Sequence, residues 1–279
     1  MIISGVSGSL DRVSRPSRMG RVVPSLMILA FLGVVSSFLI LSKTPPSGSV
    51  MISNQEQPST SELVSTPVAQ LPVDFYTTNF AAAENPMSEG GLWVNGRSTG
   101  LDWRDVATTP GKAFGTQSGS SGTYDDTTAV LKGTFGPNQE ASATVFNNDA
   151  GGDWNGEVEL RLRTNVGPHS ITGYEIEFRA RPGQAGYCDI VRWNGALGDF
   201  TPLVHVDGSS CGVGAGDVVR ATIIGNSIMA YRNDVLVMQA TDSTFGAGNP
   251  GVGFFLHNFR GSGNAADFGF SSFMARTIQ

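Results

Sequence analysis

The stretch EVELRLRT, residues 157–164, alternates charged and apolar side chains with a period of two. Successive side chains of a strand point to opposite faces, so this pattern predicts a charged face opposite an apolar one. The charged face would hold Glu157, Glu159, Arg161 and Arg163. Such a face can line a ligand groove, or it can be a solvated ladder of ion pairs that serves only solubility.

A second stretch, GYEIEFRAR at residues 173–181, has the same alternation. Its charged positions are Glu175, Glu177, Arg179 and Arg181. The segment between the two stretches is short enough to join neighbouring antiparallel strands, so we expect both charged faces on one side of one sheet. Opposite charges that face each other across two strands contribute about 0.2–1 kcal/mol per pair, so such a ladder needs no functional cause.

Four glutamates in these stretches are candidates for catalysis. They are Glu157, Glu159, Glu175 and Glu177. Retaining glycosidases use two carboxyl groups about 5 Å apart, and two same-face positions on one strand are somewhat further apart than that. A catalytic pair is therefore conceivable, but the spacing alone does not establish one.

Two tryptophans are candidates for stacking on a sugar, because a flat aromatic face suits the apolar C–H face of a sugar ring. Trp154 lies in a Gly- and Asp-rich segment, NNDAGGDWNGE, where burial is not expected. Trp193 ends an apolar run and leads into a loop that contains Asp199. For Trp93 and Trp103, near the start of the domain, we expect packing in the core or at a sheet edge.

The elements that must position these residues are strands. After residue 73 the apolar stretches are short and alternate with period two, and no stretch of ten residues has a convincing helical period. Turn signals such as GNS at 225–227 separate them. The pattern predicts an all-β, two-sheet antiparallel sandwich. The expected strands are 129–133, 140–146, 157–163, 173–181, 186–193, 202–206, 218–224, 227–232, 235–241, 251–257 and 267–275.

The composition agrees with an all-β domain. Charged residues are 15% of the 279 residues and 36 residues are Gly, as suits short strands joined by Gly-rich turns. The net charge is −6 and the sequence pI is about 5.0. Because the chain has no basic footprint, binding to nucleic acid through its phosphates is not expected.

The segment 22–42 carries no charged residue and is long enough to cross a bilayer as a helix. The arginines that precede it are Arg12, Arg15, Arg18 and Arg21. Positive charge ahead of an apolar span keeps that end in the cytoplasm, so we expect a cytoplasmic segment 1–21, a signal anchor, and an extracytoplasmic remainder. A cleaved signal peptide, which would give a secreted protein, is the alternative.

The expected extracytoplasmic part begins with residues 43–72, which are rich in Ser, Thr, Pro and Gln and read as a flexible linker before a domain at 73–279. Both cysteines, Cys188 and Cys211, lie in that domain, and in an oxidising compartment we expect them to form a disulfide. A thiol nucleophile or a two-cysteine metal site has no support from spacing or neighbours. The absence of an Asn-x-Ser/Thr site mildly favours a bacterial source.

Residues 216–256 carry a recognisable order of motifs: a Gly-Asp opening, the hairpin GNSIMAY, the segment ATDSTF and a closing GNPGVGF. With the upstream segment 124–145, this order resembles the concanavalin A-like lectin/glucanase superfamily, and its bacterial laminin-G-like modules in particular. The resemblance covers about residues 75–275 and implies a two-sheet jelly roll. It implies little about activity, because the superfamily includes lectins, glycosidases, polysaccharide lyases and adhesion modules.

In such jelly rolls the polar concave face binds sugars, so the resemblance implies a hydroxyl-rich or polyanionic ligand. The implied ligand-binding residues are Glu159, Arg161, Arg163, Glu177, Arg179, Trp154 and Trp193. Laminarinase-like members carry Glu-x-Asp-x-Glu or Glu-x-Asp-x-x-Glu on one strand, whereas this strand reads Glu-x-Glu-x-Arg. We therefore expect a polysaccharide-binding module first, a polysaccharide-degrading enzyme second, and a protein-binding adhesion module third.

Calcium recurs in this superfamily and requires several oxygen ligands, usually gathered by loops. The candidate ligands are Asp125, Asp126, Asp149 and Asp153. They lack the spacing of an EF-hand loop, and ordinary Asx turns are the alternative. The histidines, His169, His205 and His257, are scattered and form no zinc motif.

Overall fold

The structure is a computed structural model that describes residues 74–119, 126–148, 154–181, 186–258 and 263–279. The expected membrane span at 22–42 and the expected linker at 43–72 lie outside the described residues. Among the residues that are described, no helix is long and apolar enough to cross a bilayer.

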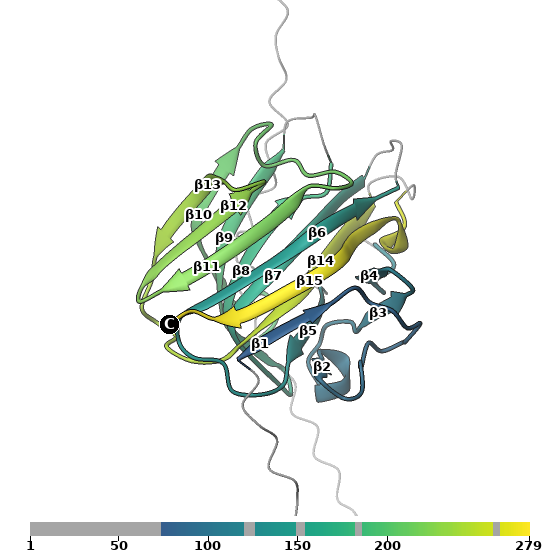
Figure 1. Cartoon of the computed structure of the whole chain (residues 1–279), viewed down its shortest axis with the longest axis horizontal. Coiled ribbons are helices and arrows are strands. Elements are labelled where there is room, and N and C mark those ends of the chain that lie inside the picture. Colours follow the sequence, from purple (N-terminus) through teal and green to yellow (C-terminus); the bar gives the residue numbers. More distant parts are fainter. Residues whose placement is uncertain (1–73, 120–125, 149–153, 182–185, 259–262) are drawn as a thin grey trace, which may run out of the picture. The chain divides into compact units, whose positions relative to one another are not determined.

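Two antiparallel sheets face each other (Figure 1). The eight-stranded sheet has the order β13-β12-β11-β6-β15-β4-β3, with β1 paired to β15, and the seven-stranded sheet has the order β10-β9-β8-β7-β14-β5-β2. The strands of the first are β1 (Phe75–Thr78), β3 (Val106–Thr109), β4 (Lys112–Gly115), β6 (Gln139–Asn147), β11 (Val218–Ile224), β12 (Ser227–Arg232), β13 (Val235–Thr241) and β15 (Phe268–Thr277). Those of the second are β2 (Trp93–Asn95), β5 (Thr127–Leu131), β7 (Trp154–Gly167), β8 (Ser170–Arg179), β9 (Tyr187–Gly195), β10 (Phe200–Asp207) and β14 (Asn249–Asn258).

The expected all-β, two-sheet antiparallel sandwich is confirmed. All eleven expected strands are present, and β11, β12 and β13 have the expected bounds. Four strands, β1 to β4, were not expected, because each spans only three or four residues. Such short strands carry too little alternation to be recognised.

The main core lies between the sheets. It takes the apolar side of the alternating stretches, including Leu160 of β7 and Ile176 of β8, together with Ala221 and Ile223 of β11, all fully buried. The disulfide Cys188–Cys211 is confirmed and adds to this core, with a Cα–Cα distance of 5.1 Å. It ties β9 to the segment that precedes β11.

A smaller apolar cluster is separate from the main core. It comprises Leu101, Trp103, Ile171, Val191 and Trp193, all buried. Leu101 and Trp103 follow the 3-10 helix η1 (Arg97–Thr99), and the ring of Trp103 meets that of Trp193 edge-on with centroids 4.6 Å apart. Since Val191 and Trp193 belong to β9, the segment after η1 packs on the side of the seven-stranded sheet that faces away from the main core.

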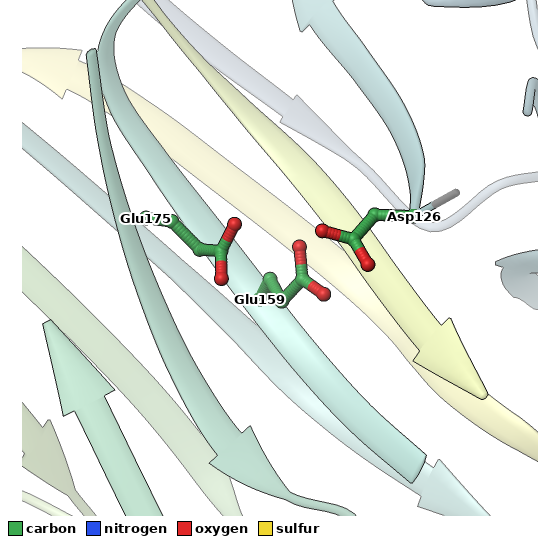
Figure 2. A group of neighbouring side chains, drawn as sticks. All are labelled: Asp126, Glu159 and Glu175. Carbon is green, nitrogen blue, oxygen red and sulfur yellow. The ribbon is translucent and has the colours of Figure 1, made fainter. Parts of the chain in front are cut away.

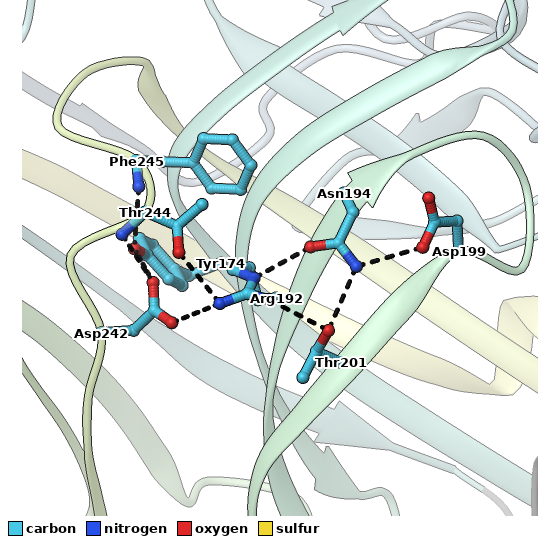
Figure 3. A network of polar contacts seen from close by, with 8 residues as sticks. All are labelled: Tyr174, Arg192, Asn194, Asp199, Thr201, Asp242, Thr244 and Phe245. Atoms are coloured by element: carbon cyan, nitrogen blue, oxygen red, sulfur yellow. Dashed lines mark hydrogen bonds and ion pairs between the residues drawn. The ribbon is translucent and has the colours of Figure 1, made fainter.

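A polar network holds the segment between β13 and β14 against β8 and β9 (Figure 3). Asp242 accepts hydrogen bonds from the Tyr174 hydroxyl at 2.7 Å, the Arg192 guanidinium at 2.5 Å and the Thr244 backbone N–H at 2.8 Å. Burial alone would raise the pKa of Asp242, but these donors outweigh it and hold the pKa below its usual value. The network is therefore strongest while Asp242 is ionised.

We expect Asp242→Asn to lower the free energy of unfolding by about 1–3 kcal/mol at pH 7, because the hydrogen bonds to Asp242 involve a charged acceptor. The pKa of Asp242 is lower in the folded than in the unfolded chain. Its contribution is therefore present above the unfolded value of about 3.9 and is lost as the pH falls through the folded value. Urea unfolding at pH 7 and pH 3 checks this: the difference between wild type and variant should shrink at pH 3. A difference that is equal at both pH values, or equal to that of the control Asp234→Asn, whose side chain is 91% exposed, would contradict it.

The disulfide closes a loop with a sequence separation of 23 residues. Constraint of the unfolded chain by such a loop contributes roughly 3 kcal/mol. We expect the double variant Cys188→Ala, Cys211→Ala to lose about this free energy in urea unfolding. Adding a reductant should destabilise the wild type and leave the double variant unchanged, and an unchanged wild type would contradict the account.

Candidate functional site

The charged stretches pair in the register of neighbouring antiparallel strands and share one face, as expected. The facing pairs are Glu157 with Arg179, Glu159 with Glu177 and Arg161 with Glu175. The next strand adds Asp189, which lies opposite Glu177. We call this side of β7, β8 and β9 the charged face.

The charged face is buried. The side chains of Glu157, Glu159, Arg161, Glu175 and Glu177 are each at most 1% exposed. The face is therefore neither a solvated ladder nor an open groove at these positions, although period-two alternation predicted one of these two. The apolar cluster provides part of the cover: the guanidinium carbon of Arg161 lies 4.8 Å from the centroid of the Trp103 ring.

Arg161 is the centre of the buried charges. Its Nη1 donates to Glu175 Oε2 at 2.9 Å, and its Nη2 donates to Glu159 Oε2. Trp193 also donates, from Nε1 to Glu175 Oε2 at 2.5 Å. One guanidinium thus holds carboxylates from two strands, while Trp193 orients one of them.

Glycine on the neighbouring strand β14 makes room for this arrangement. A Cβ at Gly253 would lie 2.2 Å from Glu159 Oε2 and 2.7 Å from Arg161 Nη2. A Cβ at Gly251 would lie 2.4 Å from the backbone oxygen of Ala129. The two glycines of this Gly-Val-Gly sequence are therefore explained by close neighbours: the backbone of Ala129 at Gly251, and the side chains of Glu159 and Arg161 at Gly253.

Burial and neighbouring charge shift the titration of two glutamates. The pKa of Glu159 is raised well above its usual value, first by burial and then by the charge of Glu175, with Arg161 opposing. The pKa of Glu177 is also raised, first by burial, then by Glu157 and by a hydrogen bond with Asp189. Both shifts favour the neutral form, because a buried carboxylate among other carboxylates is costly.

The charged face opens to solvent at one end. There Tyr187 donates its hydroxyl to Glu157 Oε1 and receives a hydrogen bond from Asn155 Nδ2 at 2.5 Å. His205 Nδ1 pairs with Asp189 Oδ1 at 2.5 Å, and the His205 side chain is 39% exposed. The rings of Tyr187 and His205 stack with centroids 6.1 Å apart.

Two aromatic residues of β14 complete this end. Phe255 lies opposite Glu157 and His257 opposite Asn155, so both project from the charged face. Both are half-buried, with ring centroids 6.4 Å apart. We call the group Asn155, Tyr187, His205, Phe255 and His257 the open end.

Sequence reasoning did not assign a role to the open end. Asn155 continues the alternation of Glu157 towards the N-terminus, and Phe255 and His257 alternate in GFFLHN, so a signal was present for these three. Tyr187 and His205 come from β9 and β10, and only the pairing of those strands brings them together.

Arg163 was expected on the charged face, and that expectation is wrong. A register shift between Leu162 and Asn165, with φ of 46° at Arg163, breaks the alternation. The side chain is instead buried against backbone oxygens of Pro137, Gly225 and Phe245, at 2.7–2.9 Å. Arg163 therefore tethers turns of the sandwich.

The other predicted residues fall into three groups. Trp193 is buried beside Trp103, and Trp93 and Trp103 are buried as expected. Arg179 is half-buried, with its guanidinium 5.5 Å from the Tyr187 ring centroid. Asp125, Asp149 and Asp153 lie outside the described residues, as does the side chain of Trp154. The sugar-binding roles expected of Trp154, Trp193 and Arg179 remain predictions, as do the calcium-binding roles expected of Asp125, Asp149 and Asp153.

Asp126 is the one expected calcium ligand that the structure describes. It precedes β5 and is buried. Its carboxylate faces those of Glu159 and Glu175, and one oxygen of each lies within 4.8 Å of the others (Figure 2). We call these three residues the carboxylate trio.

The geometry gives little room for glycosidase chemistry at the trio. The spacing of Glu159 and Glu175 is compatible with a retaining pair, which needs about 5 Å. Both carboxylates, however, bind Arg161 and are buried, so a sugar has no contact with them. The catalytic roles of Glu157, Glu159, Glu175 and Glu177 remain predictions.

No protein-family profile matches the sequence, and no curated protein matches it. Solved structures do match in fold. The carbohydrate-binding module CBM66 from Bacillus subtilis has 17% identity and a TM-score of 0.44, over 62% of this chain and 96% of that one. The Bacillus licheniformis beta-glucanase has 16% identity and a TM-score of 0.41, over 74% and 98%.

A third match is the carbohydrate recognition domain of Emp47p, with 13% identity and a TM-score of 0.45, over 76% of this chain and all of that one. These structures are of a binding module, a glucanase and a carbohydrate recognition domain. Similarity at this level carries no argument about what this chain binds.

We expect Arg161→Met to lower the free energy of unfolding by about 3–5 kcal/mol, because it leaves Glu159 and Glu175 buried without their cation. The matched control is Arg276→Met, which removes a guanidinium that is 51% exposed and pairs with Glu140; its cost should be at most about 1 kcal/mol. Urea unfolding of the two variants measures both. Equal costs would show that the Arg161 cluster is not a buried structural unit.

Proposed function

We propose that this protein is a carbohydrate-binding module and that the open end contacts the sugar. The observation that carries the proposal is the mixture of partly exposed ring and amide side chains there: His205, Phe255, His257 and Asn155. Rings contact the C–H faces of sugars, and amide and imidazole groups exchange hydrogen bonds with hydroxyls. Few precisely placed polar groups among aromatic ones are typical of small-ligand sites.

The charge at the open end favours a neutral, hydroxyl-rich glycan over a polyanion. Glu157, Glu177 and Asp189 lie behind the open end, whereas Arg179 is the guanidinium that contacts it. The net charge of the chain, −6, also opposes association with an anionic sugar. The sequence was compatible with a neutral and with a polyanionic glycan, and this distribution of charge is the reason to prefer the neutral glycan.

A glycoside hydrolase of the same fold is the second candidate. The raised pKa of Glu177 is a property of a general acid. We rank it lower because Glu157 and Glu177 are both buried, so a scissile bond could not approach them without movement of the covering groups.

We also propose that the domain functions outside the cytoplasm. Two features support this location: the uncharged segment 22–42 after four arginines, and the disulfide Cys188–Cys211. Disulfides persist mainly in oxidising compartments. The membrane would then be a partner through the N-terminal segment.

Binding of the full chain to a panel of neutral and acidic polysaccharides tests the proposal. We expect retention on a neutral glycan, at least a tenfold loss of affinity in His257→Ala and Phe255→Ala, and little change between about 0.05 and 0.5 M salt, because no ion pair is involved. The matched control is Phe75→Ala on β1, which removes a ring that is 58% exposed.

Three results would contradict the proposal. They are the absence of retention on every glycan, retention that the open-end variants leave unchanged, and retention on acidic glycans that salt abolishes. If new reducing ends appeared in the same samples, the protein would hydrolyse the glycan, and hydrolysis would be its function in place of binding.

A further inference from the structure

The carboxylate trio brings together side chains from three separate elements. Asp126 precedes β5, Glu159 lies on β7 and Glu175 lies on β8. In the sheet, β14 separates β5 from β7, and Gly253 on β14 has no side chain, so that the side chains of Glu159 and Arg161 extend over it. The three carboxylates therefore point towards one another on the charged face (Figure 2).

The trio has more negative than positive charge. The charges that act most strongly on Glu159 are those of Glu175, Asp126 and Glu157, against that of Arg161. Arg161 binds both glutamates of the trio, and Asp126 adds a third carboxylate whose charge also acts on Glu159. Buried charges of one sign require a counter-charge, a proton or a metal ion.

A second observation points to a ligand. Glu159 Oε1 is buried and has no hydrogen-bond partner among the described residues, because Arg161 takes the other oxygen. Glu159 itself is 0% exposed. Nearly all buried polar atoms in proteins have a partner, so a buried carboxylate oxygen without one points to a bound ligand.

The ligand set suits a hard cation. Calcium binds carboxylate oxygens at about 2.3–2.6 Å, so oxygens on its opposite sides are about 4.6–5.2 Å apart. Three oxygens within 4.8 Å of one another therefore fit around one calcium ion. Magnesium dehydrates reluctantly and usually keeps several waters, so a buried set of protein carboxylates suits it less well.

We infer that Asp126, Glu159 and Glu175 bind one calcium ion beneath Trp103 and Trp193. The ion neutralises the charge left over by Arg161 and supplies the partner of Glu159 Oε1. This inference does not depend on the proposed sugar binding, because the trio and the open end share no residue. It also differs from the sequence expectation, which placed calcium on loop aspartates and included only Asp126 of the trio.

Terbium luminescence tests the site directly, because Trp193 donates to Glu175 and Trp103 covers Arg161, so both indoles are close enough to sensitise a bound lanthanide. The full chain is unfolded in urea with EDTA and refolded with terbium, since the trio is buried. We expect one bound ion per chain, which calcium displaces and magnesium displaces at least tenfold more weakly.

Three variants accompany the measurement. Glu159→Gln and Asp126→Asn should each weaken terbium binding at least tenfold. The matched control Asp102→Asn, which removes a carboxylate that is 42% exposed beside His169, should leave it unchanged. No terbium signal, a signal that trio variants leave unchanged, or equal displacement by magnesium would overturn the inference.

A melting experiment covers the case in which a variant fails to fold. Wild type refolded with calcium should melt at a higher temperature than wild type refolded with EDTA, by several degrees, because a ligand that binds only the folded chain stabilises it. Equal melting temperatures would show that protons, not calcium, balance the trio. If calcium-free protein still binds glycan, the proposed function holds whether or not calcium raises the melting temperature.

Discussion

The structure depends on one constraint: the charged face of β7 and β8 is buried, so its charges must be satisfied inside the protein. Arg161 meets most of that requirement by binding Glu159 and Glu175 while its guanidinium lies against Trp103. A buried ion pair is seldom a large net gain in stability, because desolvation offsets the attraction. Its effect is on specificity: strand register, the Trp103 segment and the Trp193 indole must all fit the same guanidinium.

Several separate features follow from this constraint. Gly253 is required because any Cβ there would collide with Glu159 and Arg161. The segment after η1 covers one end of the charged face, and so the accessible groups are confined to the other end, around His205 and His257. We propose a neutral ligand at that end and a cation beneath the cover. The proposed sugar site at the open end is thus separate from the proposed cation site at the carboxylate trio.

The sequence was informative about strands and about which side chains share a face. Alternation located β7 and β8, and their pairing brought Glu159 and Arg161 beside Glu177 and Glu175 as expected. Alternation contains no information about burial of a polar face, which here depends on Trp103, some 58 residues before Arg161. A β-bulge turns the side chain of Arg163 away from the charged face, and a single sequence carries no reliable signal for a bulge. Tyr187 and His205 became neighbours only through strand pairing.

Hydroxyl-radical footprinting of the folded full chain, read by mass spectrometry, tests most directly whether the charged face is closed at one end and open at the other. Oxidation rates of individual side chains follow their solvent exposure. The account predicts that Trp103 and Trp193 are protected, that Phe255, His257 and His205 react, and that Phe75 reacts fastest as the exposed reference. Trp103 and Trp193 that react as readily as His257 would contradict a buried charged face.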